Sequence, residues 1–103
     1  MEISAKDFPQ QVLGADGPVL VDFWGSWCIP CKQMEPVVEK IEESGRDLDV
    51  FQVNVNRNPQ LRTRYQIQGV PTFILFQEGE ERGRVVGAQT PGQLIRFIDD
   101  HTL

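Results

Sequence analysis

Short hydrophobic runs along the chain predict the strands of a sheet. Residues 19–24 are apolar, β-branched or aromatic, apart from Asp22, and residues 49–54 alternate between apolar and other positions. Both patterns are typical of central strands. A third run, 73–76, leads through a glycine-containing turn into a last strand over 82–86. The last two strands must therefore pair as an antiparallel hairpin.

Four other segments carry apolar residues at helical spacing. The first helix begins near Asp7, its expected cap, and the second extends to about Glu43. The third is short and follows Asn58, which is also placed to cap it. The last has the sequence of a capping box, with Thr90 before the first turn and Gln93 three residues later. The pattern thus separates helices from strands along the whole chain.

The order of these elements indicates the fold class. With a short first strand at Ile3, the chain is expected to run β-α-β-α-β-α-β-β-α. This order favours an α/β fold with a central mixed β-sheet and helices on both faces. A length of 103 residues, without repeats or linkers, suits a single domain over 1–103.

Composition and charge argue against some classes of partner and bear on the expected location of the protein. Ten Lys and Arg against fifteen Asp and Glu give a formal net charge of -5, which argues against nucleic acid or an anionic membrane as the main partner. No apolar run approaches the roughly 20 residues that a membrane helix needs. Residues 1–7 lack the basic and apolar regions of a signal peptide, so a cytoplasmic location is expected.

Both cysteines lie between a predicted strand and a predicted helix. Cys28 and Cys31 are three residues apart, which on a helical turn places their Cβ atoms roughly 5–6 Å from each other. A small adjustment brings them to disulfide range, about 3.5–4.5 Å. Cys28 stands at the expected helix N-terminus, where free N–H groups and the helix dipole favour a thiolate. The spacing therefore predicts a reversible dithiol/disulfide site with Cys28 as the nucleophile.

Two alternatives to exchange chemistry apply to the cysteine pair, and one to the nearby carboxyl group. The cysteines could be an inert buried pair or half of a zinc site, although zinc takes about four ligands and His101 is the only histidine. Asp22 interrupts an apolar run, so burial should raise its pKa and keep it available for proton exchange. Alternatively, backbone N–H groups of the following loop satisfy its carboxylate.

Several short motifs follow one another along the chain in a characteristic order and spacing. They are Leu-Val-Asp-Phe-Trp at 20–24, Trp-Cys-Ile-Pro-Cys-Lys at 27–32, Pro36, Gly-Val-Pro-Thr at 69–72, Gly79 and Val-Gly-Ala at 86–88. A pair of cysteines two residues apart is a weak signal, but this combination is highly specific. In these motifs the chain resembles the thioredoxins, and the resemblance covers nearly all of it.

The resemblance implies the thioredoxin fold and dithiol–disulfide exchange with protein substrates. Cys28 would form a mixed disulfide that Cys31 then resolves, and Asp22 would be the acid/base that assists Cys31. Pro71 would be the family's cis-proline facing the disulfide, leaving the Val70 backbone free to pair with an extended substrate. An apolar rim around Cys28 would bind that substrate, formed by Trp27, Ile29, Pro30, Gly69, Val70, Gly87 and Ala88.

The expected function is that of a protein-disulfide reductase recycled by a thioredoxin reductase. We expect a monomer without bound cofactor or metal, its electrons arriving through the reductase. Ile29 replaces the glycine of the commonest thioredoxin site, and Gln52 stands where many members carry lysine. Both differences bear on redox potential and proton transfer, and neither removes a reacting group. A more oxidising, isomerase-like exchanger and a non-redox binding subunit on the same fold are the alternatives.

Overall fold

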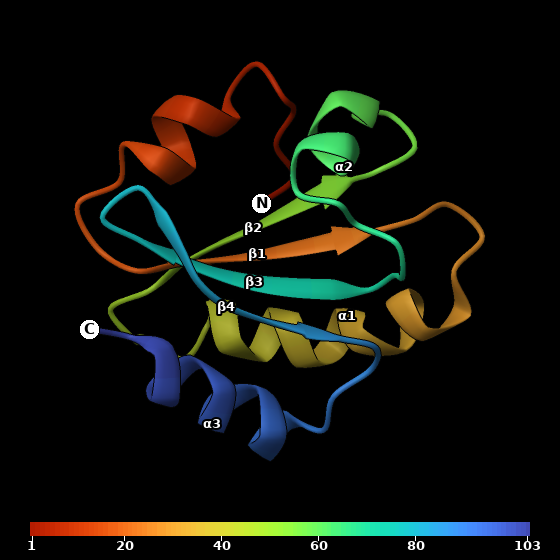
Figure 1. Ribbon diagram of the computed structural model, residues 1–103. Helices are drawn as coiled ribbons and strands as arrows, with labels where there is room; N and C mark the ends of the chain where they lie inside the picture. The colour runs from red at the N-terminus through yellow and green to blue at the C-terminus, as the bar shows by residue number, and fades with distance from the viewer.

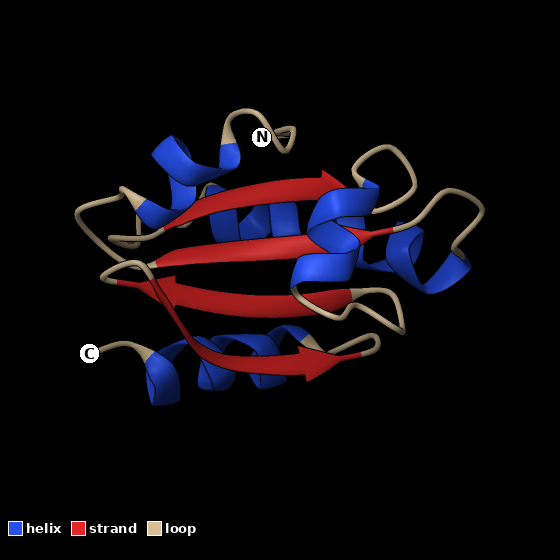
Figure 2. Ribbon diagram, turned by 45° about the horizontal axis from the view of Figure 1, so that its top comes forward, coloured by secondary structure: helices blue, strands red, loops and turns tan.

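A single four-stranded sheet organises the computed structural model, which describes all of residues 1–103. Its strand order is β2-β1-β3-β4, with β1 at Val19–Trp24, β2 at Asp49–Asn54, β3 at Thr72–Gln77 and β4 at Glu80–Val86. β1 and β2 are parallel, whereas the β1–β3 and β3–β4 pairs are antiparallel (Figure 2). The predicted mixed sheet with a final hairpin is therefore confirmed.

Helices cover both faces of the sheet, as the element order predicted (Figure 1). α1 (Ile29–Glu42) and α3 (Pro91–His101) lie on one face, and α1 continues through Pro36. The short π-helix η1 (Pro9–Leu13) and α2 (Pro59–Arg64) lie on the other. The cysteines are at the end of the sheet where β1 leads into α1.

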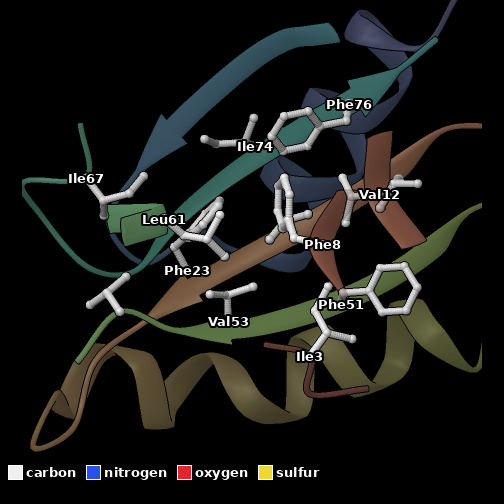
Figure 3. Packing of buried hydrophobic residues seen from close by; sticks show 13 residues of the cluster. Ile3, Phe8, Val12, Phe23, Phe51, Val53, Leu61, Ile67, Ile74 and Phe76 are labelled. Atoms are coloured by element: carbon white, nitrogen blue, oxygen red, sulfur yellow. The ribbon is translucent and has the colours of Figure 1, made fainter. Parts of the chain in front are cut away.

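Alternation along β1 decides which side chains face α1. Val19, Val21 and Phe23 belong to the hydrophobic cluster on the η1 and α2 face, where Phe8 packs against Phe23 and other aromatic rings (Figure 3). Leu20 belongs instead to the cluster beneath α1 and α3. Because side chains alternate between the two faces of a strand, Asp22 shares the face of Leu20. Its carboxyl group therefore lies on the side of the helix that carries the cysteines.

The beginning of the chain differs from the prediction. Ile3 does not lie on a strand: one bridge pairs Glu2 with Gln52 of β2, and the Ile3 N–H donates to the Gln52 carbonyl at 2.9 Å. The pairing stops because the chain turns at Ser4. Its carbonyl oxygen accepts the N–H groups of both residue 7 and residue 8. This turn also displaces the helix start, so Asp7 is not the cap of η1.

The two other predicted caps have different outcomes. Asn58 precedes α2 but makes no capping hydrogen bond. Its amide instead donates to the Asn54 carbonyl and accepts the Ala5 N–H, both at 2.9 Å, so it ties the N-terminal segment to β2. The capping box of α3 is confirmed: the Gln93 N–H donates to Thr90 Oγ1 at 3.1 Å, and the Thr90 N–H donates to Gln93 Oε1 at 2.9 Å.

Candidate active site

The loop between β1 and α1 places the two cysteines at the N-terminus of α1. Trp27 has a left-handed backbone with φ of 62°, which is uncommon for a residue other than glycine. Cys28 follows in an extended conformation as the N-cap of α1, and Cys31 lies in the first turn. The two form a disulfide with Cα atoms 5.3 Å apart. The predicted position of Cys28 at the helix start is confirmed.

The two sulfur atoms have different surroundings. Cys28 is half-buried, whereas Cys31 is 5% exposed. The Cys31 N–H donates to Cys28 Sγ at 3.2 Å, and this sulfur lies 3.7 Å from the Val70 carbonyl oxygen. An N–H donor together with the helix N-terminus stabilises negative charge on Cys28 Sγ, the more exposed or outer sulfur. The geometry therefore favours Cys28 as the thiolate.

The loop before β3 lies beside Cys28 Sγ and is held in place by hydrogen bonds. The Val70–Pro71 peptide bond is cis, as the resemblance implied. The Thr72 hydroxyl donates to the Gly69 carbonyl at 2.6 Å, and the Gly87 N–H donates to the Pro71 carbonyl at 2.7 Å. The first bond closes the loop that precedes β3, and the second joins this loop to the residue that follows β4. They hold the Val70 carbonyl against Cys28.

Residues of the predicted apolar rim lie around this loop and differ in exposure. Trp27 is 98% exposed and Ile29 70% exposed, an unusual display for large apolar side chains. Pro30 and Ala88 are exposed, Gly69, Val70 and Gly87 are half-buried, and Pro71 is buried. Sequence reasoning missed Val86, which is 57% exposed at the end of β4. A Cβ on Gly69 would lie 3.1 Å from Val86 Cγ1, so the two residues are adjacent.

A partly open cavity of about 400 Å³, called the inner cavity below, lies beside the disulfide and is bordered by both cysteines and by α1. Asp22 reaches it from β1, and its Oδ1 atom is buried without a hydrogen-bond partner. Burial raises the pKa of Asp22 to about 7, and the negative charges of Glu2 and Glu35 add to the effect. The raised pKa predicted from sequence is confirmed. The cavity is lined by Glu2, Asp22, Trp24, Gly25, Trp27, Cys28, Cys31, Lys32, Glu35, Val38, Glu39, Glu42 and Gln52.

Two asparagines that sequence reasoning missed hold the loop before the cysteines. The Ser26 N–H donates to Asn56 Oδ1 at 2.8 Å, and Asn54 Nδ2 donates to the Ser26 hydroxyl at 3.4 Å. A Cβ on Gly25 would lie 3.2 Å from Val70 Cγ2, so glycine permits this loop to approach the cis-proline loop. A signal was present in the sequence. β1 and β2 are parallel, so polar residues at the end of β2 lie at the same sheet edge as the cysteine loop.

Gln52 lies next to the carboxyl group of β1. It is the direct partner of Asp22 in the register of the β1–β2 pair. Its side chain donates to Glu42 Oε1 at 3.2 Å, at the cavity wall formed by α1. The neutral amide therefore occupies a position between Asp22 and the edge of the sheet.

The residues proposed for a zinc site do not come together. No three His, Cys, Asp or Glu side chains converge in a way that could hold a metal ion. His101 ends α3, where its Nδ1 atom lies 2.8 Å from the Phe97 carbonyl oxygen. That end of α3 is at the opposite end of the sheet from the start of α1 (Figures 1 and 2).

Comparison with known proteins agrees with this geometry. The family model described as Thioredoxin matches residues 1–100. The chain belongs to the thioredoxin family. It has the thioredoxin fold, and its cysteine pair makes it a thiol–disulfide oxidoreductase of this family that carries redox equivalents.

Individual thioredoxins match over almost the whole chain. A thioredoxin of Rickettsia bellii is 37% identical, over 96% of this chain and 95% of its own. A thioredoxin of Mycobacterium tuberculosis is 40% identical, over 97% and 87%. A bifunctional thioredoxin reductase/thioredoxin of Mycobacterium leprae is 41% identical, over 97% of this chain and 22% of its own. None of the helices combines the length and hydrophobicity needed to span a membrane.

Proposed function

We propose that the protein is a protein-disulfide reductase in which Cys28 is the nucleophile. The observation that carries this proposal is the Cys31 N–H at 3.2 Å from Cys28 Sγ, at the start of α1. The Cys28 thiolate attacks one sulfur of a substrate disulfide and expels the other as a thiolate. Cys31, after losing its proton, attacks Cys28 Sγ and releases the second substrate sulfur. The substrate gains two electrons, and the Cys28–Cys31 disulfide remains.

We propose that Asp22 accepts the proton of Cys31 in the second step. Both groups line the inner cavity, which offers a route for the proton. A pKa of about 7 suits this task, because an acid/base works best when its pKa is near the ambient pH. The buried Oδ1 atom has no competing donor. Asp22 can therefore take up a proton without breaking a hydrogen bond at that oxygen.

The substrate segment is proposed to lie on the cis-proline loop in an extended conformation. Pro71 has no N–H to donate, and Val70 is half-buried beside Cys28, so a backbone laid along this loop reaches the sulfur. Around it the exposed Trp27 and Ile29 provide apolar contact. The proposed binding surface comprises Trp27, Ile29, Pro30, Gly69, Val70, Pro71, Gly87 and Ala88.

A thioredoxin reductase is the proposed source of electrons. The Mycobacterium leprae relative unites a thioredoxin reductase and a thioredoxin in its name, which supports this pairing. We further propose a monomer, folded as a single domain over 1–103, that acts in the cytoplasm. Turnover of a disulfide-containing protein with a bacterial thioredoxin reductase tests the pairing, and absence of turnover would contradict it.

The assignment of the two sulfur atoms is tested by trapping. Cys31→Ser should accumulate a mixed disulfide with a disulfide-containing protein, because Cys28 attacks but nothing resolves the product. The matched variant Cys28→Ser should trap nothing. Mass spectrometry of the non-reduced reaction measures both. Trapping by Cys28→Ser instead would reverse the two roles. No trapping by either variant would favour a binding subunit with idle thiols.

A further inference from the structure

Five carboxyl groups line the inner cavity, and two of them, Glu2 and Asp22, differ in their hydrogen bonds. Glu2 Oε1 accepts the indole N–H of Trp24 at 2.9 Å, and Glu2 Oε2 accepts the backbone N–H of Asn54 at 3.0 Å. Asp22 has a buried oxygen with no partner. Hydrogen bonds from N–H donors favour the ionised form of a carboxyl group, whereas burial without donors favours the neutral form. Burial raises the pKa of Glu2 above its ordinary value, but these two hydrogen bonds and the positive charges of the Met1 amino group and Arg57 oppose that rise. Asp22 has no such donor at its buried oxygen, so in this pair the hydrogen bonds favour charge on Glu2.

The sheet places these two groups on one face. The N-terminal segment runs beside β2, where Glu2 bridges to Gln52, and Gln52 is in turn the direct partner of Asp22. Residues directly opposite one another in neighbouring strands point to the same side. Glu2, Gln52 and Asp22 thus form a row across the sheet, with the outer two backbones about 10 Å apart at the usual strand spacing. The residue between the two carboxyl groups is uncharged.

We propose that Glu2 is a positioning residue for Asp22: its carboxylate, fixed by Trp24 and Asn54, sets the electric field that keeps a proton on Asp22. The proposal rests on the acid/base role proposed for Asp22. A fixed negative charge disfavours a second one on a nearby buried carboxyl group such as Asp22, as in other carboxyl pairs that share a site. Loss of the charge would let Asp22 ionise at lower pH and uncouple its proton from the ionisation of Cys31.

Other charges face Asp22 as well, and Glu2 is the strongest of the carboxylates. Burial is the largest cause of the raised pKa of Asp22, the charge of Glu2 is the second and that of Glu35 the third. β3 contributes no charge, because the residue paired with Asp22 is Phe73. The charged or titratable groups around the cavity are the Met1 amino group and Glu2 from the N-terminal segment, and Cys28, Cys31, Lys32, Glu35, Glu39 and Glu42 from the start and body of α1.

The direct test is a titration of the Asp22 carboxyl carbon by NMR in the oxidised protein. Glu2→Gln should move the Asp22 midpoint from about 7 toward lower pH, and Glu35→Gln should move it less. Glu43→Gln is the matched control, because it removes the same charge from an exposed residue outside the cavity and should leave the midpoint in place. Glu2→Lys should move the midpoint further than Glu2→Gln.

The Trp24 indole N–H signal serves as the structural check. Glutamine keeps one acceptor oxygen where glutamate has two, so it accepts the Trp24 N–H when its NH2 group is turned toward the Asn54 N–H. In that orientation the signal stays near its wild-type position in Glu2→Gln. An unchanged Asp22 midpoint with this signal intact would overturn the proposal, and so would an equal shift in Glu43→Gln. In the reduced protein, the pH profile of Cys31 alkylation should follow the same order of variants.

The NMR midpoint does not depend on turnover. Failure of the Cys31→Ser trapping experiment would therefore refute the proposed function and leave the shift in place. An unchanged midpoint in Glu2→Gln alongside successful trapping would refute only the role of Glu2.

Discussion

The outer and inner sides of the disulfide differ in the exposure of their side chains and in the charges that surround them. On the outer side, Trp27 and Ile29 are 98% and 70% exposed, and the cis-proline loop stands beside Cys28. On the inner side, Cys31 is buried and borders a cavity lined by carboxyl groups, among them the buried Asp22. Each sulfur therefore meets a different environment. The contrast suggests that recognition takes place on the outer side and proton transfer on the inner side.

The two sides should also differ in their effect on stability. An apolar side chain that is exposed in both the folded and the unfolded state contributes little to the free energy of unfolding. A buried carboxyl group without a donor disfavours the folded protein whenever it must ionise. Changes on the inner side should therefore alter stability and its pH dependence, whereas changes on the outer side should alter mainly the response to protein substrates.

Asp22→Asn, a change on the inner side, should have the largest effect on the free energy of unfolding and on its pH dependence. Unfolded aspartate titrates near 3.8 and folded Asp22 near 7, so between these values only the folded state holds the proton. The free energy of unfolding of the wild type therefore falls as pH rises through this interval, and stays level above it. At about 1.4 kcal/mol per pH unit, the interval from 3.8 to about 7 corresponds to at most about 4 kcal/mol.

Asparagine cannot ionise, so the variant should escape this loss. It should be more stable than the wild type at pH 8, by up to about 4 kcal/mol, with the difference disappearing near pH 4. Urea unfolding of the oxidised proteins at several pH values measures it, with Glu43→Gln as control. The same variant should slow resolution of the mixed disulfide by Cys31. A stability difference that is constant with pH would contradict the assignment of the raised pKa to Asp22.

The outline of this site was predictable, because its signals are local in sequence. The spacing of the cysteines and the apolar run before them placed Cys28 at a helix start. A single carboxyl group within that run, Asp22, was enough to predict its raised pKa. Short apolar runs at 19–24 and 73–76, alternation at 49–54 and a turn before 82–86 also predicted the four strands that the structure shows. The cis bond at Pro71 followed only from the resemblance to thioredoxins, since few X-Pro bonds are cis.

The missed features depend on contacts between residues distant in sequence. Glu2 reaches the cavity only because the N-terminal segment pairs with β2, and its bond to Trp24 joins positions 22 residues apart. Asn58 looked like a helix cap, but its amide bonds to Ala5, 53 residues away. Tertiary pairing overrode the local preference for capping. Val86 was missed because alternation alone does not tell which end of a strand borders the site.

Trp27→Ala should have an intermediate effect, mainly on the binding of protein substrates, although Trp27 also borders the inner cavity. Because the side chain is 98% exposed, the free energy of unfolding should change by less than about 0.5 kcal/mol. Loss of a tryptophan from the centre of an interface typically costs more than about 1 kcal/mol, so KM for a protein disulfide should rise about tenfold. Steady-state kinetics with a protein and with a small disulfide compares the two. An equal loss with the small disulfide would mean that Trp27 acts on the sulfur atoms.

Ile29→Gly should have the smallest effect on KM, and it tests most directly whether the outer side serves recognition alone. Ile29 is 70% exposed in the first turn of α1, next to Cys28. Glycine gains more freedom in the unfolded chain, so the free energy of unfolding should fall by about 0.5–1 kcal/mol. With less apolar surface lost than in Trp27→Ala, KM for a protein disulfide should rise only about threefold.

Equilibration against a glutathione buffer then shows on which side Ile29 acts, with Ile29→Ala as the control for lost side-chain volume. If Ile29 serves recognition alone, both variants should raise KM and leave the midpoint potential of the Cys28/Cys31 couple in place. A changed potential in both variants would show that Ile29 alters the solvation of the Cys28 thiolate. A change in Ile29→Gly alone would assign the effect to the backbone between the cysteines. Either change would mean that the outer side tunes the chemistry as well as the choice of partner.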